Sequence, residues 1–442
     1  MMMFFPKLNR PAWRSPLGPA LLWVGVTAAA PAAAQSLTDV VQRALQDYPA
    51  LSAAQARTDA ARADIARARS QHYPQIGVAA TSSRYGTGTP AGANTSTLSP
   101  TARLNLWSGG RIEAEAQRAE ALTRAAGHAQ AATLDEVALL ATEAYLNWAK
   151  TADLYQLAVR NVYAHQETLD DIQKISQVDT GRRIDYQQAL VRMENANLAL
   201  QQRKADMLQA IERVRRFWPG EMQGRPQPLD AELGVTGVLG QLPGSLAQAL
   251  AAVDDRVPSV ARALADVQAA QFALRQAEGL RWPTVDVTTS RVNDPSNPLR
   301  QTMLTQLQVN MPVYNGGQAT AQIEGALGQL RAAQAAVEET RLLAREKLAL
   351  AFQEWQAARA RTGVGESQSE VGDQLVEGYR AQFRVGRRSL LDLLNIQADA
   401  FNYRSAARAA FHDERLARAR MLAAMGVLAE RFPSAGEVRT PR

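Results

Sequence analysis

The 442-residue chain contains no cysteine and few aromatic residues, which make up 6% of it. Without cysteine there can be no disulfide, thiolate metal site, cysteine nucleophile or lipid-modified N-terminal cysteine. The scarcity of aromatic residues, together with alanine runs throughout the chain, favours helix over sheet as the main secondary structure. The formal net charge is +6, which by itself would suggest a nucleic-acid partner.

The first 34 residues have the order of a secretory signal peptide: a basic start, a short apolar core and a small-residue cleavage site. Lys7, Arg10 and Arg14 precede the apolar run at 17–27, and a row of alanines ends at Ala34. That run is shorter than the roughly 20 residues that a membrane-spanning helix needs, and no later segment is apolar enough to be one. Removal of residues 1–34 lowers the net charge to 6 − 3 = +3, which is too small to indicate nucleic-acid binding.

The chain repeats its own pattern of marker residues at two nearly equal offsets, as expected of an internal duplication. The pairs 209 residues apart are Ser36/Ser245, Pro49/Pro258 and Pro74/Pro283, and the pairs 207 residues apart are Gly109/Gly316, Trp148/Trp355 and Asp185/Asp392. We therefore predict a tandem repeat behind a signal peptide at 1–34. The predicted segments are a first repeat at 35–217, a linker rich in Pro and Gly at 218–244, a second repeat at 245–428 and a C-terminal tail at 429–442.

Each repeat is predicted to begin with helices and to continue as a β-hairpin. In the first repeat we expect helices at 37–48 and 50–72, followed by a hairpin at about 74–108. There the residues alternate between an apolar and a polar face, as in a strand with one apolar side; the two sets are Leu98, Ala102, Leu104 and Leu106 against Thr101, Arg103 and Asn105. The second hairpin is expected at about 283–315. Both hairpin tips are rich in Gly, Pro, Asn and Ser.

More than a hundred residues without proline follow each hairpin. A helix from 111 to 177 would be about 100 Å long at 1.5 Å per residue. Its apolar residues are mostly small, so its stability must come from packing against other long helices, as in a coiled coil. A Gly-Arg-Arg at 181–183 and another at 386–388 are the only good turn signals in these stretches.

Strands of about ten residues with one apolar face match transmembrane β-strands, which need roughly 9–11 residues. A barrel in lipid must close on itself, and the smallest such barrels have about eight strands. Because this chain supplies four strands, several copies would have to share one barrel. The alternative is a pair of soluble hairpins that cover helix ends. The signal peptide, the duplication and the very long helices argue against that alternative.

Three features together resemble the TolC family of outer-membrane exit ducts. They are the two Ser-Leu helix openings, the segment 310–317 (Asn-Met-Pro-Val-Tyr-Asn-Gly-Gly) and the segment 385–394 (Val-Gly-Arg-Arg-Ser-Leu-Leu-Asp-Leu-Leu). Each motif is short, but their order, repeated twice at a near-constant offset, is highly specific. The resemblance extends from Leu37 to about Gly426.

The resemblance implies a mixed, mainly α fold in which three protomers each give four transmembrane β-strands to a shared 12-stranded barrel. The barrel would continue as a long α-helical coiled-coil tunnel in the periplasm. An equatorial region around the tunnel would include 218–244 and the C-terminal tail. Such a homotrimer sits in outer-membrane lipid and extends into the periplasm. It receives cargo from an inner-membrane ABC or proton-driven transporter through a periplasmic adaptor (membrane fusion) protein.

Members of that family close the periplasmic end through charged and polar contacts among inner-helix residues just after the second Gly turn. By position, the resemblance assigns Arg388 as the gate arginine, with Asp392 and Asn395 at two successive ring positions. Asp185 is the matching acid of the first repeat and the expected partner of Arg388 across neighbouring helices. A carboxylate repeated by threefold symmetry in a narrow, water-filled neck attracts cations strongly. Apart from the resemblance, Asp392 would be interpreted as an ordinary solvated acid.

The chain departs from the family pattern at the second ring position. Asn395 stands where better-known members carry a second aspartate. The neck would therefore hold three ring carboxylates rather than six, and we expect weaker block by multivalent cations.

The hairpin turns at the far ends of the long helices are the adaptor-docking tips that the resemblance implies, with Gly386, Arg387 and Gly181 as the candidate residues. Gly181 lies four residues before Asp185, whereas Gly386 lies six residues before Asp392. The first-repeat turn is therefore two residues out of register with the second.

The sequence contains no catalytic, metal-binding or cofactor-binding pattern. Its four histidines lack metal-ligand spacing, and the Gly-rich segment at 86–92 lacks the Gly-Lys-Ser/Thr ending of a phosphate-binding loop. Energy for transport must then come from partner proteins. We expect a passive conduit for type I protein secretion rather than an enzyme. The alternatives are a multidrug or small-molecule efflux duct and, in a different class, a periplasmic coiled-coil adaptor or scaffold.

Overall fold

The structure, a computed structural model, describes residues 36–83, 95–220, 226–227, 239–251, 255–293 and 301–432. These residues all belong to one compact unit, 35–442. The predicted signal peptide at 1–34 lies outside the described residues. Most residues of the predicted hairpin tips, the linker and the C-terminal tail also lie outside the described residues.

The first repeat folds into helices on either side of a β-hairpin. Helix α1 (Leu37–Asp47) begins with a capping box, in which Ser36 and Asp39 each accept a hydrogen bond from the other's backbone N–H. Pro49 occupies the first turn of α2 (Pro49–Arg69), where its missing N–H costs nothing. The further elements are η1 (Ser70–His72), β1 (Gln75–Ser83), β2 (Thr95–Trp107), α3 (Arg111–Val178), η2 (Thr180–Arg182) and α4 (Arg183–Arg215). The helices predicted at 37–48 and 111–177 are found within one residue of those bounds.

The second repeat has the same order of elements. They are α6 (Leu246–Ala251), α7 (Pro258–Glu278), η3 (Gly279–Arg281), β3 (Thr284–Asn293), β4 (Gln301–Asn310), α8 (Gln318–Arg384), α9 (Leu390–Ala424) and η4 (Ala429–Arg431). In both repeats a pair of glycines with φ between 66° and 84° connects the last strand to the long helix: Gly109-Gly110 and Gly316-Gly317. This left-handed conformation favours glycine, which explains why the Gly-Gly pair recurs at the same place in each repeat.

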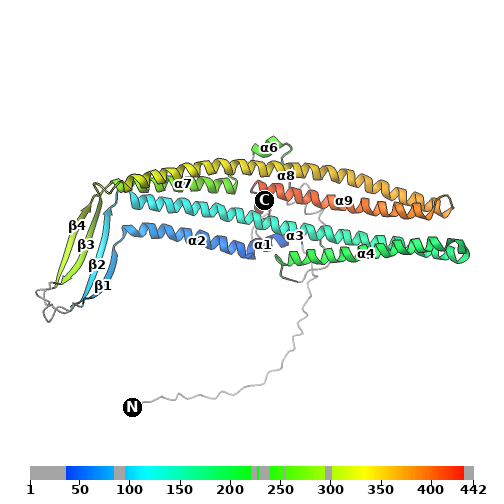
Figure 1. Ribbon diagram of the computed structural model, residues 1–442, viewed down its shortest axis with the longest axis horizontal. Helices are drawn as coiled ribbons and strands as arrows, with labels where there is room; N and C mark the ends of the chain where they lie inside the picture. Colours follow the sequence, from blue (N-terminus) through cyan, green and yellow to red (C-terminus); the bar gives the residue numbers. More distant parts are fainter. Residues whose placement is uncertain are drawn as a thin grey trace, which may run out of the picture. The chain divides into compact units, whose positions relative to one another are not determined.

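The two hairpins join into one antiparallel sheet with the strand order β1-β2-β3-β4 (Figure 1). Strands β2 and β3 pair with each other, so the sheet joins the two repeats. Leu104 lies opposite Val287, which in turn lies opposite Leu307. The neighbouring row, with Arg103 opposite Thr288, points to the other face. The predicted alternation within each hairpin therefore continues across the whole sheet.

The helices pack side by side in a fixed order (Figure 1). Helix α3 packs against α2 and α4 on one side and against α7 and α9 on the other, and α8 packs against α7 and α9. Among the described residues α8 has no comparable interface with α2 or α4. The helical layer, like the sheet, therefore has two edges. Helices α3 and α8 contain 68 and 67 residues, which corresponds to about 100 Å each at 1.5 Å per residue.

Large apolar side chains are concentrated where α1 packs against the middle of α3. Tyr145 and Trp148 are fully buried there, with their rings edge to face at 5.4 Å. At the equivalent positions of the second repeat, the rings of Phe352 and Trp355 lie 5.8 Å apart. Elsewhere the long helices bury mainly alanine, so they hold together through close contact of small side chains. No helix in the described ranges is both long and apolar enough to cross a membrane.

A buried carboxylate on α3 fixes the start of η4 against this core. Asp135 is only 7% exposed, and its Oδ1 accepts a hydrogen bond of 2.8 Å from the backbone N–H of Ala429. Burial raises the pKa of Asp135 above its ordinary value of 3.8. The folded protein therefore binds this proton more readily than the unfolded chain does.

We expect Asp135→Ala to destabilise the protein by about 1–3 kcal/mol, because the Ala429 N–H would lose its buried acceptor. Asp135→Asn keeps an acceptor and serves as the matched control. Because the folded-state pKa is the higher one, the stabilising contribution of the proton is fully present below pH 3.8 and is lost as the pH rises through the folded-state pKa. Thermal unfolding followed by circular dichroism should depend less on pH over this window in Asp135→Asn than in wild type. An unchanged or steeper dependence would contradict this assignment.

Candidate functional site

The apolar face of the sheet is exposed to solvent in the single chain. Ile76 is 81% exposed and Leu307 is 66% exposed, although both are large apolar residues. A contiguous exposed apolar face marks a surface that contacts lipid or another protein. The opposite face carries Arg103, Thr288 and Gln306. The sheet thus offers one side to an apolar medium and the other to water.

An exposed aromatic residue flanks each strand at the end where the chain enters or leaves the helices. Tyr73 precedes β1, Trp107 ends β2, Trp282 precedes β3 and Tyr314 follows β4. The rings of Trp107 and Trp282 contact each other edge to face at 6.4 Å. Aromatic residues are enriched at membrane–water interfaces, where they form girdles around outer-membrane barrels. These four residues mark the level at which the sheet would leave a bilayer.

The edges of the sheet lack partner strands. Strands β1 and β4 form the two edges, and neither pairs with a further strand among the residues that the structure describes. Open edges present unpaired backbone N–H and C=O groups, which lipid cannot satisfy. The geometry therefore requires a further strand on each side.

The edges of the helical layer carry exposed apolar residues at a spacing of seven. On α4 these residues, here called the α4 seam, are Ile184, Val191, Leu198 and Ala205. On α8 the corresponding α8 seam consists of Leu343, Leu350, Ala357, Val364, Val371, Gly378 and Val385. A heptad of apolar residues is typical of a coiled-coil contact. Each seam lies on an edge helix, so each is available to a helix outside this chain.

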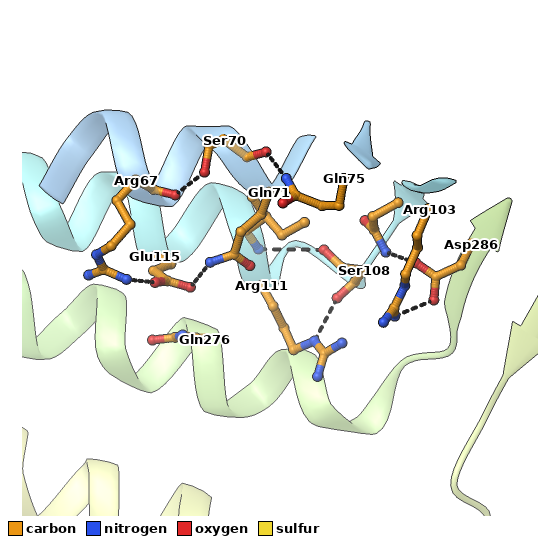
Figure 2. Close-up of a pocket in the computed structure, with 12 residues that line it drawn as sticks. Arg67, Ser70, Gln71, Gln75, Arg103, Ser108, Arg111, Glu115, Gln276 and Asp286 are labelled. Atoms are coloured by element: carbon orange, nitrogen blue, oxygen red, sulfur yellow. Dashed lines mark hydrogen bonds and ion pairs between the residues drawn. The ribbon is translucent and has the colours of Figure 1, made fainter. Parts of the chain in front are cut away.

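A polar cavity of about 520 Å³ lies where the sheet meets the helices, lined by residues from α2, α3, α7 and the first three strands (Figure 2). Asp286 of β3 is 4% exposed. Its carboxylate accepts hydrogen bonds of 2.9 Å each from Arg103 Nη2 and Asn105 Nδ2, both on β2. This network links the hairpins of the two repeats on the polar side of the sheet.

Arg388 lies in the turn between α8 and α9 and is held by both helices. Its guanidinium carbon is 4.2 Å from the centroid of the Tyr379 ring, a cation–π contact. Its Nε donates a hydrogen bond of 3.1 Å to Gln382 Oε1. Its Nη1 lies 3.9 Å from Asp392 Oδ2, in the first turn of α9. The structure thus brings the predicted residues Arg388 and Asp392 together.

Within the described residues of one chain Arg388 does not pair with Asp185, and the contact expected across neighbouring helices stays a prediction. Arg388 pairs with Asp392 instead, because residues four apart on one helical face are neighbours. Asp185 lies in the first turn of α4, and within the described part of the chain it forms no ion pair. Helices α4 and α9 meet near their turn ends, where Ala189 lies in one apolar cluster with Leu390 and Leu394.

In the single chain Asn395 is hydrogen-bonded to an arginine. Arg192 of α4 donates a hydrogen bond of 3.0 Å from its Nη2 to Asn395 Oδ1. Sequence reasoning missed Arg192, Tyr379 and Gln382, because no sequence pattern specifies which faces of α4, α8 and α9 meet. The resulting contacts connect the two pairs of long helices at the turn end.

The two turns at the far ends of the long helices differ in construction. Gly386 adopts a left-handed φ of 74°, and the backbone N–H of Arg387 donates to the carbonyl of Gln382 at 2.9 Å. Gly181 has no such φ and lies in η2, where its N–H donates to Asp179 Oδ1 at 3.0 Å. A 3₁₀ turn capped by aspartate thus replaces the glycine turn, consistent with the two-residue difference in spacing. Arg387 and both glycines are exposed.

Comparison with known proteins agrees with this arrangement. The sequence profile of the family described as "Outer membrane efflux protein" matches residues 40–219 and 249–427. Outer membrane efflux protein BepC of Brucella suis biovar 1 (strain 1330) is 25% identical over 402 residues, which cover 89% of this chain and 86% of BepC. Protein CyaE of Bordetella pertussis is 22% identical over 406 residues, which cover 88% of this chain and 83% of CyaE.

Solved structures of channels have the same fold. CusC superposes with a TM-score of 0.76 at 18% identity, over 89% of this chain and 92% of that one. The outer-membrane channel OprN has a TM-score of 0.75 at 19% identity, over 90% and 91% of the two chains. The open state of the MtrE outer membrane channel of Neisseria gonorrhoeae has a TM-score of 0.73 at 18% identity, over 88% of each chain.

A two-faced sheet with open edges, carried on very long helices, defines a channel whose barrel is shared between copies. The chain belongs to the outer membrane efflux protein family. The predicted mainly α fold is confirmed: two repeats place four strands in one antiparallel sheet carried on long paired helices, the fold of the trimeric channels of this family, which join a barrel to a helical tunnel. Proteins of this family are passive channels rather than enzymes, and work with adaptor proteins and inner-membrane transporters. The protein lies in the outer membrane and extends into the periplasm.

Proposed function

We propose that three copies of this chain form the outer-membrane conduit of a tripartite export system, with the polar face of the sheet lining the passage. The observation that carries this proposal is that the sheet and the helical layer each have two edges without a partner among the described residues. Strand β4 of one copy would pair with β1 of the next, and the α8 seam would pack on the α4 seam of the same neighbour. A head-to-tail contact of this kind generates a closed ring when the rotation completes a full turn.

The cargo proposed first is an exported protein, as in type I secretion. The resemblance to TolC ducts supports this cargo, and the chain has no cysteine to which a lipid could be attached. Small-molecule efflux is the second candidate, and the name of the relative BepC, an outer membrane efflux protein, favours it. Deletion of the gene separates the two: loss of a secreted protein from the medium supports the first, and increased sensitivity to toxic compounds supports the second.

We also propose that the turn end of the long helices is the periplasmic gate and the docking site of the adaptor. Arg388, Asp392, Asn395 and Asp185 are assigned to the gate. The exposed turns at Gly386-Arg387 and at Gly181 are assigned to the adaptor. The ion pair between Arg388 and Asp392 and the hydrogen bond from Arg192 to Asn395 support this assignment, because they tie α8, α9 and α4 together at that end. The segments 218–244 and 429–442 are proposed to belong to an equatorial region around the tunnel.

A single substitution tests the proposed ring. Asn395→Asp would raise the number of ring carboxylates in a trimer from three to six, which deepens the negative potential of a narrow neck. We expect block by a trivalent cation to become tighter by about tenfold or more, equivalent to about 1.4 kcal/mol. The measurement is single-channel recording in planar bilayers as the blocker is titrated from the periplasmic side.

Glu339→Gln provides the control, because it removes an exposed carboxylate of α8 that lies 47 residues before the Gly386 turn, far from the neck. Block of the control should remain at the wild-type value. The ring assignment is contradicted if Asn395→Asp channels are blocked no more tightly than wild type. Wild-type trimers that add no conductance to bilayers would instead contradict the proposed conduit.

A further inference from the structure

The polar cavity between sheet and helices contains more cationic than anionic side chains. Arg67, Arg103 and Arg111 line it together with two carboxylates, Glu115 and Asp286. Figure 2 shows Arg67 with Glu115 at one end of the cavity, Arg103 with Asp286 at the other, and Arg111 between the two pairs. The cavity volume of about 520 Å³ lies within the range of roughly 300–1,000 Å³ that is typical of small-molecule sites.

Both carboxylates of the cavity already have partners. The two oxygens of Asp286 accept hydrogen bonds from Arg103 and Asn105. Glu115 Oε1 accepts from Arg67 Nη1 at 3.4 Å, and its Oε2 accepts from Gln71 Nε2 at 2.8 Å (Figure 2). Both carboxylates are therefore held by partners of their own, and the three arginines leave the lining with one positive charge in excess.

Arg111 is the remaining arginine. Its Nε donates a hydrogen bond of 3.1 Å to the carbonyl of Ser108, which fixes the guanidinium at the start of α3 (Figure 2). Neither Nη atom forms a hydrogen bond or ion pair with any residue that the structure describes. An arginine fork with both ends available is the side chain best suited to bind an oxyanion.

A second group in the cavity selects among oxyanions. Asn105 Oδ1 is buried and accepts no hydrogen bond from any described residue, while Asn105 Nδ2 is engaged by Asp286. A buried acceptor of this kind needs a donor. Hydrogen phosphate keeps a P–OH group at neutral pH and can supply that donor, whereas sulfate is fully deprotonated and cannot.

Three charged residues of the cavity, Arg111, Arg103 and Asp286, have no charged counterparts in the other repeat. At the offsets that relate the repeats, Arg111 corresponds to Gln318, Arg103 to Asn310 and Asp286 to Gly77. If these charges only helped to join a hairpin to its helices, the same need would exist in both repeats. Arg111 is therefore not a residue that every junction of hairpin and helices needs, whereas Arg103 and Asp286 also join the two hairpins.

We propose that this cavity binds inorganic hydrogen phosphate at the wall of the passage. The inference rests on the proposed function, because that function assigns the polar face of the sheet to the lumen. Arg111 supplies two N–H donors to the phosphate oxygens, and Asn105 Oδ1 accepts from the P–OH. The amide side chains of Gln71, Gln75 and Gln276 complete the polar lining.

Equilibrium dialysis of radiolabelled inorganic phosphate against detergent-purified trimers at low ionic strength tests the site directly. Wild type should bind one phosphate per chain, with sulfate competing about tenfold less well, because the hydrogen bond to Asn105 would be missing. Glycerol phosphate should compete no better than sulfate, because a phosphate monoester has lost most of its P–OH at neutral pH. Arg111→Gln should weaken phosphate binding by about tenfold or more, as expected when hydrogen bonds to a charged group are lost.

Two further variants guard against a merely structural effect. Arg281→Gln removes an exposed arginine of η3 that does not line the cavity, and should bind phosphate like wild type. Arg111→Lys keeps the charge but not the fork, and should give intermediate affinity. All variants are first checked for trimer formation on gels.

The possible outcomes separate this inference from the proposed function. Trimers that conduct ions but show no saturable phosphate binding would overturn the site alone. Equal phosphate affinity of wild type and Arg111→Gln, or equal affinity for phosphate and sulfate, would overturn it as well. Protein that forms no channel in bilayers overturns the conduit, whatever the result of dialysis.

Discussion

Leu198→Glu on the α4 seam is expected to abolish the stable trimer. Leu198 is 72% exposed in the single chain, so the substitution removes no contact within the protomer. In the assembled ring it would place a carboxylate in an apolar coiled-coil contact, where an unpaired charge costs several kcal/mol. The contact occurs three times per ring. We expect at least a tenfold loss of the trimeric species, since each 1.4 kcal/mol corresponds to about tenfold.

The partner of Leu198 follows from helix geometry. Leu198 lies 17 residues beyond the Gly181 turn and Val371 lies 15 residues before the Gly386 turn, which places both about 25 Å from the tips at 1.5 Å per residue. Val371 of the neighbouring copy should therefore face Leu198. The double variant Leu198→Glu with Val371→Lys is expected to restore a large part of the trimer, because the two new charges have opposite sign.

The measurement is the amount of heat-modifiable trimer in outer-membrane fractions, with total protein quantified in parallel. Glu194→Gln, an acidic position on α4 outside the seam, serves as the control and should assemble normally. Wild-type amounts of trimer in Leu198→Glu would refute the seam contact. Failure of Val371→Lys to rescue, with rescue by a lysine elsewhere on α8, would refute the pairing but leave the seam.

Leu307→Arg is expected to prevent insertion into the outer membrane. Leu307 lies on the exposed apolar face of β4, opposite Val287. An arginine on the lipid face of a barrel costs about 2–4 kcal/mol near the bilayer midplane and less towards the interfaces. Leu307 lies between the midplane and the interface, so we expect the substitution to cost about 2 kcal/mol in each of the three copies. Folded trimer in the outer membrane should fall by more than tenfold.

The neighbouring residue provides a matched control. Gln306 lies one position earlier in the same strand and points to the polar face, opposite Thr288. Gln306→Arg introduces the same side chain at nearly the same depth but towards water. It should insert normally and change only ion selectivity, which bilayer recordings would report. Equal loss of trimer in both variants would show that the two faces of the sheet have been assigned in the wrong sense.

The sequence was a good guide to the elements because strong local signals specify them. The alternation in the hairpins appears where the pattern predicted it, and the repeated Gly-Gly pairs and prolines mark the boundaries of elements in both repeats. The long proline-free stretches predicted α3 and α8 for the same reason. These features depend on neighbours along the chain, and a single sequence contains that information.

Contacts at the turn end were less predictable because they depend on which helical faces meet. The resemblance assigned Arg388 and Asp392 to the same gate without pairing them, and the structure shows an ion pair between the two. The sequence could not show that Tyr379 lies under Arg388 or that Arg192 reaches Asn395. The pairing of Arg388 with Asp185 stays a prediction, because equivalence by repeat position does not specify which side chains face each other across helices. Similarly, Arg111 attracts attention only after strands and helices have enclosed a cavity.

The two edges of each copy are different: one has β1 and the α4 seam, and the other has β4 and the α8 seam. This difference has a genetic consequence. A subunit with a damaged α4 seam still offers an intact α8 seam and an intact β4, so it can join a growing ring and then leave it unfinished. When such a subunit is produced in equal amounts with the normal one, only about one ring in eight would contain three sound copies. Edge mutations should therefore be dominant over the wild-type allele, whereas mutations that merely unfold the chain should be recessive.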